Sequence, residues 1–221
     1  MARRPVVDDD AFTVLDWDDV PDRLDMLRQV IRADPAVLAR TGTVFEHPLL
    51  SHAIWVDDPA AVALILELGA DPNFHPEHHD PPVIMVLRTS RDWRASALPL
   101  LAAGADLERT GLEGTALHTA VATGDAERVR FVLDRGGRVD TPAGDDETPL
   151  WRAANRGDLA ICRLLLAAGA DPSLADSWYQ ATPAEIARQS ERARGQPELI
   201  ALLDAARRRR PARRAANRRD R

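Results

Sequence analysis

The sequence has little of several residue types, and each shortage excludes a class of protein. It has one cysteine, Cys162, so it cannot form an internal disulfide, and such usage is typical of a reducing cytosol. Aromatic residues make up 5% of the chain, so a core must consist of Leu, Ala, Val and Ile. The longest apolar run, near residues 60–66, is far shorter than the ~18 residues of a membrane span. The first ten residues become acidic where a signal peptide would become apolar. We therefore expect a cytoplasmic protein without membrane contact.

Lysine is also absent, and all 29 basic residues are arginine. This bias favours a GC-rich coding genome, so we expect a bacterial source. The charge is unevenly distributed, because residues 207–221 contain nine arginines and one aspartate and carry +8, whereas the rest of the chain carries −14. So dense a run of one charge cannot pack into a core. We therefore predict a disordered arginine-rich tail over 207–221, and we treat 1–10 as a separate acidic N-terminal segment.

What the sequence does contain is an internal repeat with a period of about 34 residues. Matching positions begin at His47, Pro81, Thr115, Thr148 and Thr182. Two glycines of the fourth unit, Gly157 and Gly169, recur at the same spacing in the third unit as Gly124 and Gly136. A period of this length is typical of a solenoid, in which each unit buries its apolar face only against its neighbours.

One unit, residues 147–172, predicts its own local structure. Thr148 can cap a first helix, and Pro149 suits the first helical position, where its missing N–H costs nothing. Gly157 ends that helix, and Asp158 opens a second one that carries apolar residues on one side. Gly169 lets the chain leave in a left-handed conformation. The glycines therefore separate two short helices instead of weakening one long helix.

The stretches TALHTA (115–120) and TPLWRA (148–153), with GAD at 69–71, 104–106 and 169–171, resemble the ankyrin repeat. The resemblance implies an all-α ankyrin-repeat solenoid of about five to six helix-turn-helix units joined by β-hairpin-like loops. It predicts a repeat domain over 11–206, with a degenerate first unit at 11–46, units starting near 47, 81, 115 and 148, and a C-terminal cap unit at 182–206. The unit from 81 has RTSRDWRAS (88–96) in place of its middle glycine, so we expect a longer or distorted loop there.

Candidate chemical groups are few. The hairpin NFHPEHHD (73–80) places three histidines between His75 and His79, but this spacing belongs to no well-defined zinc class, so we favour a solvated loop over a metal site. The resemblance implies a structural hydrogen-bonding role for His118. Cys162 lies at an apolar helix position, which favours a buried thiol. The sequence has no nucleophile elbow, P-loop, zincin or dinucleotide-binding motif, so we expect neither catalysis nor a cofactor.

The remaining possibility is a binding surface. In ankyrin-repeat proteins, the hairpin tips and the inner face of the first helices form a concave groove for a partner protein. Carried over to this chain, the arrangement predicts ten partner-binding residues: Trp55, Arg88, Glu113, Asp145, Asp146, Glu147, Asn155, Arg156, Trp178 and Tyr179. Trp, Tyr and Arg are enriched in interface hot spots. For Trp178 and its neighbours, partner contact and packing remain equal alternatives, whereas for Trp151 packing is favoured.

We therefore expect a monomeric, non-catalytic adaptor or scaffold that binds an unidentified protein partner. The alternative is a nucleic-acid-associated regulator that acts through residues 207–221, since arginines neutralise phosphates. No aromatic residues alternate with these arginines, so base stacking is not supported.

Overall fold

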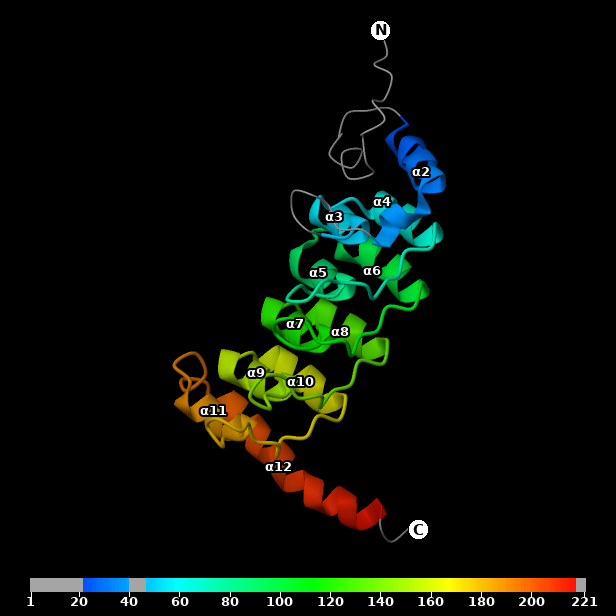
Figure 1. Ribbon diagram of the computed structural model, residues 1–221. Coiled ribbons are helices and arrows are strands. Elements are labelled where there is room, and N and C mark those ends of the chain that lie inside the picture. Colours follow the sequence, from blue (N-terminus) through cyan, green and yellow to red (C-terminus); the bar gives the residue numbers. More distant parts are fainter. Residues whose placement is uncertain (1–21, 40–46, 218–221) are drawn as a thin grey trace. The chain divides into compact units, whose positions relative to one another are not determined.

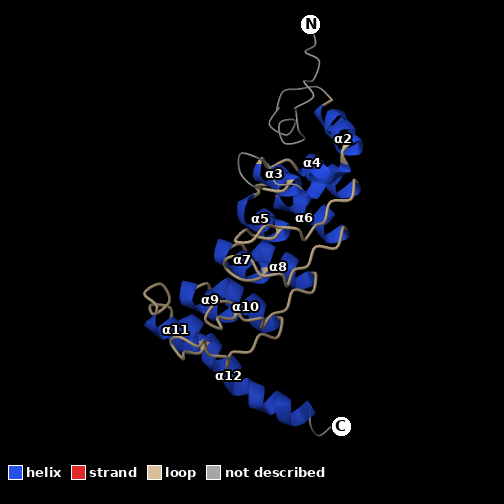
Figure 2. Ribbon diagram, in the orientation of Figure 1, coloured by secondary structure: helices blue, strands red, loops and turns tan. Residues whose placement is uncertain are grey.

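The computed structural model describes residues 22–39 and 47–217, and the side chains as far as Arg209. The predicted acidic segment 1–10 and much of the predicted first unit lie outside the described residues. The chain divides into two compact units, residues 1–112 and residues 113–221. Figure 2 shows that the regular structure is helical, and the 143–147 loop carries an isolated antiparallel bridge between Ala143 and Glu147.

The first unit consists of stacked helix pairs. Its elements in chain order are α2 (Arg23–Ala33), the 3-10 helix η1 (Pro35–Ala39), α3 (Leu49–Trp55), α4 (Pro59–Glu67), α5 (Pro82–Thr89) and α6 (Trp93–Ala102). Each α-helix contacts its own hairpin partner, α3 with α4 and α5 with α6. First helices also contact first helices, α3 with α5, and second helices contact second helices, α4 with α6 (Figure 1). This neighbour-only packing is that of an ankyrin-repeat helical solenoid.

The second unit repeats this arrangement. Its helices are α7 (Ala116–Thr123), α8 (Ala126–Asp134), α9 (Pro149–Arg156), α10 (Leu159–Ala167), α11 (Pro183–Gln189) and α12 (Pro197–Asn217). The first helices α7, α9 and α11 contact in succession, and the second helices α8, α10 and α12 do the same. Its core is formed mainly by small and aliphatic side chains, and Phe131 and Trp151 are its buried aromatic residues.

The helix boundaries follow the predicted capping residues. The side chain of Thr148 accepts a hydrogen bond from the Trp151 N–H at 3.2 Å, and Pro149 occupies the first turn. Asp158 caps α10 by accepting from the Ile161 N–H at 3.0 Å. Gly157 ends α9 in the left-handed region with φ of 76°. Caps of this kind contribute about 1 kcal/mol each, so they define short helices whose own propensity is marginal.

Gly157 also lies where a side chain would not fit. A Cβ built there would lie 2.8 Å from the carbonyl oxygen of Arg192 in the turn before α12. At Gly136, by contrast, φ is 87° and no atom lies within 4 Å of such a Cβ. The first glycine is therefore required by both conformation and packing, and the second by conformation alone.

The loop predicted to be longer or distorted in the unit from 81 is one residue longer than the glycine-containing turns between α7 and α8 and between α9 and α10, which have two residues each. Three residues, 90–92, separate α5 from α6, as three residues separate α3 from α4. The hydroxyl of Ser90 donates to the Asp57 carboxylate, and the Arg91 N–H donates to the same group at 3.3 Å. Asp92 then caps α6. The prediction of a longer loop is therefore confirmed, and a side-chain carboxylate from the preceding repeat holds this turn where a left-handed glycine makes the turn in the second unit.

The C-terminal helix differs from the predicted boundary at residue 206. Helix α12 continues as a helical backbone to Asn217, where the sequence suggests a disordered tail. Arginine and alanine are among the best helix formers, and α12 enters this segment already nucleated by its packing on α10 and α11. Residues 218–221 of the predicted tail lie outside the described residues. None of the described helices is both long enough and apolar enough to cross a membrane.

Candidate partner-binding surface

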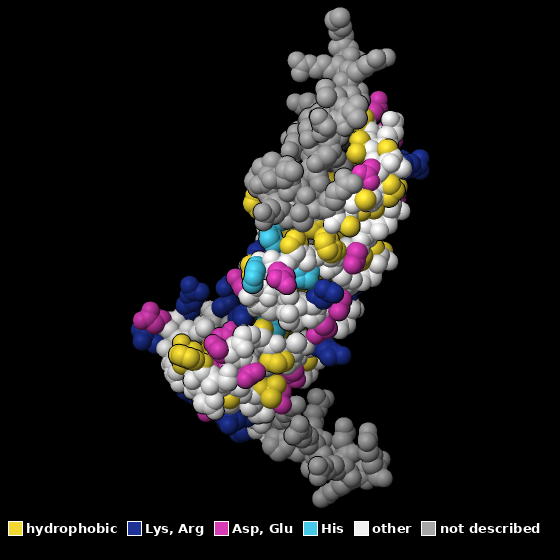
Figure 3. All heavy atoms as spheres, in the orientation of Figure 1, with side chains coloured by type: hydrophobic (Ala, Val, Ile, Leu, Met, Phe, Trp, Pro, Cys, Tyr) yellow, Lys and Arg dark blue, Asp and Glu magenta, His cyan; other side chains and the backbone are white. Residues whose placement is uncertain are grey.

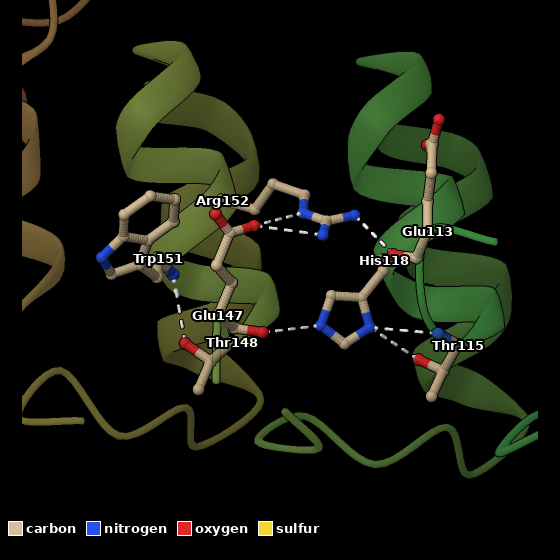
Figure 4. Close-up of polar contacts among 7 residues, drawn as sticks. All are labelled: Glu113, Thr115, His118, Glu147, Thr148, Trp151 and Arg152. Atoms are coloured by element: carbon tan, nitrogen blue, oxygen red, sulfur yellow. Dashed lines mark hydrogen bonds and ion pairs between the residues drawn. The ribbon is translucent and has the colours of Figure 1, made fainter. Parts of the chain in front are cut away.

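A buried polar network joins the first helices of the second unit. The imidazole of His118 on α7 accepts from the Thr115 N–H at 3.2 Å through Nδ1, and its Nε2 donates to the Glu147 carbonyl at 3.0 Å. The guanidinium of Arg152 on α9 binds the Glu147 carboxylate at 3.1 Å and donates to the Glu113 carbonyl at 2.7 Å. Figure 4 shows these contacts bridging neighbouring repeats. His118 is fully buried, so the structural role predicted for it is confirmed.

The network uses two of the residues predicted to bind a partner. Glu147 is half-buried and paired with Arg152, so its carboxylate has a structural partner. Glu113 contributes its backbone carbonyl to the same arginine. Both residues therefore help to place the tip of the 143–147 loop relative to α7 and α9.

Trp151 belongs to the core beneath this loop. Its side chain is 2% exposed, and its Nε1–H donates to the Ala181 carbonyl at 2.9 Å. The predicted packing role is confirmed. The ring of Tyr179 stacks on the Trp151 indole, with centroids 6.3 Å apart and an interplanar angle of 19°. The buried tryptophan is therefore a fixed base for the 176–181 loop.

Asp176 organises the 176–181 loop, although the sequence analysis did not single it out. Its carboxylate is 2% exposed and accepts from the Tyr179 and Ala181 backbone N–H groups. Burial alone would raise the pKa of this carboxyl, but those hydrogen bonds hold the pKa below its usual range. An aspartate placed just before a turn that lacks glycine is the sequence signal that could have identified it.

Trp178 and Tyr179 project from this anchored loop into solvent. They are 73% and 58% exposed. The adjacent Ser177 N–H donates to the Asp145 carbonyl at 2.8 Å, which connects the loop to the 143–147 tip. Asp145 and Asp146 are exposed at that tip. The structure therefore brings four of the ten predicted residues together: Asp145, Asp146, Trp178 and Tyr179, which we call the aromatic–acidic surface.

Four other predicted residues lie elsewhere. Trp55 ends α3 and is 59% exposed, and Arg88 on α5 pairs with Asp80 at 2.7 Å; both belong to the first unit. Asn155 and Arg156 are half-buried at the end of α9. The Asn155 carbonyl accepts from the Ser190 hydroxyl, so this end of the helix faces the next repeat. The ten residues therefore do not form one continuous set within a single unit.

The histidine-rich hairpin has local contacts instead of a ligand cluster. The Nδ1 atoms of His75 and His79 lie 3.0 and 3.1 Å from the carbonyls of Asn73 and Glu77. The ring of His79 meets that of His47 edge-on, with centroids 5.0 Å apart. Burial lowers the pKa of His47, and nearby His79 lowers it further. Among the residues that the structure describes, no group of three or more His, Cys, Asp or Glu side chains is arranged to hold a metal ion.

Cys162 has the properties of a core thiol. It is fully buried on α10, which confirms the predicted placement. Burial raises the pKa of the thiol to about 12, and the nearby Asp158 carboxylate raises it as well. A thiol in this environment is protonated and inert at neutral pH.

Comparison with known proteins supports the repeat assignment. Residues 92–176 match the family model described as "Ankyrin repeats (3 copies)". The chain is 38% identical over 94 residues to diacylglycerol kinase iota of rat, a match that covers 40% of this chain and 8% of the kinase. It is also 38% identical over 79 residues to a zebrafish protein named putative palmitoyltransferase ZDHHC13, covering 35% of this chain and 12% of that protein.

The chain thus spans only a small part of these relatives, and the matches are confined to their repeat regions. An ankyrin-repeat domain is itself a non-catalytic interaction module, and such repeats generally mediate protein–protein interaction. Because the relatives are eukaryotic, they give no support to the predicted bacterial source, which stays a prediction. The helix pairs, the neighbour-only packing and the match over residues 92–176 together show that the chain contains ankyrin repeats.

Proposed function

We propose that this protein is an adaptor that binds a partner protein, with the aromatic–acidic surface as its principal contact site. The observation that carries the proposal is the exposure of Trp178 and Tyr179 on a loop that is already ordered. Large aromatic side chains in water are unfavourable, and tryptophan and tyrosine dominate interface hot spots. A loop held by Asp176 would lose little conformational entropy on binding, so most of the contact energy would appear as affinity.

The other predicted residues would extend this site. Arg156 and Asn155 lie on α9, the same first helix that carries Trp151, and Glu147 lies beside the exposed carboxylates of the tip. Trp55 and Arg88 of the first unit, and the side chain of Glu113, stay predictions for secondary contacts. A cytoplasmic location and a monomeric state are likewise proposals that accompany the adaptor function.

Affinity purification from native extract tests the proposal. The full-length chain, a Trp178→Ala/Tyr179→Ala variant and a Leu98→Ala control would be compared after nuclease treatment. Leu98 is 46% exposed on a second helix of the first unit, so its loss removes exposed apolar surface from the unit that does not carry the proposed site. Discrete proteins should be retained by the wild type and the control and lost by the double variant. If all three chains captured the same proteins equally, the aromatic–acidic surface would not be the site that binds the partner.

The second candidate is nucleic-acid contact through the arginine-rich end of α12. Arg207, Arg208 and Arg209 are exposed on the helix, and six further arginines follow them. Binding through phosphates depends steeply on salt, by roughly one unit of slope for each neutralised phosphate. Replacing Arg208 and Arg209 with glutamine should therefore lower the salt slope for duplex DNA by about two. An unchanged slope would eliminate this candidate.

A further inference from the structure

The aromatic–acidic surface combines two kinds of exposed group in a small area. The hydrogen bond between the Ser177 N–H and the Asp145 carbonyl, at 2.8 Å, joins the two loops directly. Trp178 follows the first of these residues and Asp146 follows the second. An aromatic residue and a carboxylate residue therefore each lie one position away from the same bond. Figure 3 shows hydrophobic and acidic side chains interspersed on the visible face of this unit.

Several acidic side chains of this unit are held in ion pairs. Glu147 pairs with Arg152, Glu198 with Arg163, and Asp204 with Arg188. In the described part of the chain, the side chains of Asp145 and Asp146 have no ion-pair partner, and both are exposed. Asp146 also adopts the left-handed conformation, with φ of 62°, which requires its surroundings to hold the backbone there. The tip thus keeps two negative charges in solvent, next to each other in sequence and beside the exposed aromatic pair.

A ligand complementary to this surface has both a positive charge and an apolar stem. Arginine and lysine side chains meet this description, because the head can bind carboxylates while the stem and the charge lie against an aromatic face. An acidic or phosphorylated segment would be repelled by Asp145 and Asp146. A purely apolar segment would cover the aromatic rings but leave the two carboxylates desolvated, which opposes binding.

We propose that the partner of this protein presents a basic segment, with an arginine or lysine side chain seated between the aromatic pair and the carboxylates of this surface. The inference rests on the proposed function and adds the chemistry of the partner to it. Trp178 and Tyr179 supply the contact area and the attraction of a cation to an aromatic ring. Asp145 and Asp146 supply charge selection and faster encounter.

Selection from a random peptide library on the full-length chain tests this chemistry without knowledge of the natural partner. Peptides that bind the wild type but not a Trp178→Ala/Asp145→Asn/Asp146→Asn variant should be enriched in arginine and lysine and depleted in aspartate and glutamate. Wild-type-specific peptides that are neutral or acidic would overturn the inference. In that case Trp178→Ala alone would still weaken binding, so the adaptor proposal would survive. Peptides that bind the wild type and Trp178→Ala equally would overturn both.

The affinities of variants for the best peptide then distinguish a direct contact with Asp145 and Asp146 from attraction by the net charge of the protein. Asp145→Asn/Asp146→Asn should weaken binding about fivefold, because exposed ion pairs contribute little individually. Trp178→Ala should weaken it at least about thirtyfold, whereas Trp178→Phe should retain most of the affinity. A control with the same change in net charge, Asp134→Asn/Glu191→Gln, replaces two exposed acids elsewhere in the unit. An equal loss of affinity in the control would mean that the net negative charge of the unit attracts the peptide. It would overturn the assignment of Asp145 and Asp146 as the contacts of the basic side chain.

The arginine-rich tail of a second copy of the chain could bind the aromatic–acidic surface in place of a partner protein. Residues 207–221 are themselves basic, so a second copy could occupy the surface. Light scattering over a range of concentrations would reveal dimers that the Asp145→Asn/Asp146→Asn variant fails to form. Such dimers would identify the basic segment as that of a second copy and would overturn the assignment to a foreign partner.

Discussion

Replacing each of two tryptophans of the second unit with alanine should change the free energy of unfolding by very different amounts. Trp151 is 2% exposed and Trp178 is 73% exposed. Replacing a buried tryptophan with alanine costs about 3–5 kcal/mol, because transfer energy is lost and a cavity remains. Trp151 also donates a hydrogen bond to the Ala181 carbonyl, and it stacks on Tyr179. Since each of these contacts contributes about 1 kcal/mol, we expect a loss near the top of that range, about 4–5 kcal/mol.

The same change at Trp178 should alter the free energy of unfolding by less than about 0.5 kcal/mol, because its side chain has few contacts to lose. Urea denaturation followed by far-UV circular dichroism measures both values without relying on the removed indole. A loss of 4–5 kcal/mol approaches the whole stability of a small domain, so Trp151→Ala could fail to fold. Trp151→Phe provides a second measurement, for which we expect a loss of about 1–2 kcal/mol.

The expected result also has a functional side. Trp151→Phe removes the bond to Ala181 but keeps a ring beneath Tyr179, so it should lower partner affinity less than Trp178→Ala while lowering stability more. The reasoning fails if Trp151→Ala costs less than about 1.5 kcal/mol, or if both tryptophans cost the same. Either outcome would mean that the 176–181 loop does not rest on a fixed base.

Three further predictions concern the core and the turns. Gly136→Ala should lower the free energy of unfolding by about 1 kcal/mol, from backbone strain alone. Gly157→Ala should lower it by about 3 kcal/mol, because a backbone carbonyl must also move. Equal shifts of the unfolding temperature for the two variants would contradict this. Cys162 should react with a thiol reagent at least about a hundredfold more slowly in the native chain than in urea, and similar rates would show that it is accessible. Because burial and His79 lower the pKa of His47, the unfolded chain binds its proton more readily. Stability should therefore fall as pH drops through about 6.5, and His47→Gln should reduce that dependence; an unchanged profile would exclude His47 as its source.

Much of the fold could be predicted because its determinants are local. Thr148, Asp158 and Gly157 begin and end helices through hydrogen bonds and conformations that involve residues within a few positions along the chain. The period of 33 or 34 residues then places equivalent helices against each other. The structural hydrogen-bonding role of His118 and the burial of Cys162 follow from their positions in this repeat, and both were predicted correctly.

The predictions that failed or remained open depended on other parts of the chain. The sequence predicted a longer loop at 90–92 but not what holds it: Asp57, more than thirty residues earlier, accepts hydrogen bonds from it. The boundary of the last helix depends on packing against α10 and α11, which helps to extend a segment that charge alone would leave disordered. Neither the contact with Asp57 nor the packing of α12 can be recognised from the residues of the segment itself.

The sequence by itself determined the repeat, its helix pairs, the capping residues and the acidic body with its basic end. It could also indicate that aromatic and acidic residues occur near the last hairpins. The sequence favoured packing for Trp151, but only the tertiary structure decided that Trp178 is exposed, because burial depends on which residues of the neighbouring loop cover each ring. It also decided that Glu147 is paired while Asp145 and Asp146 face water, since that depends on where Arg152 reaches. A local pattern can select a helix or a turn, but the contacts of a surface depend on residues that only folding brings together.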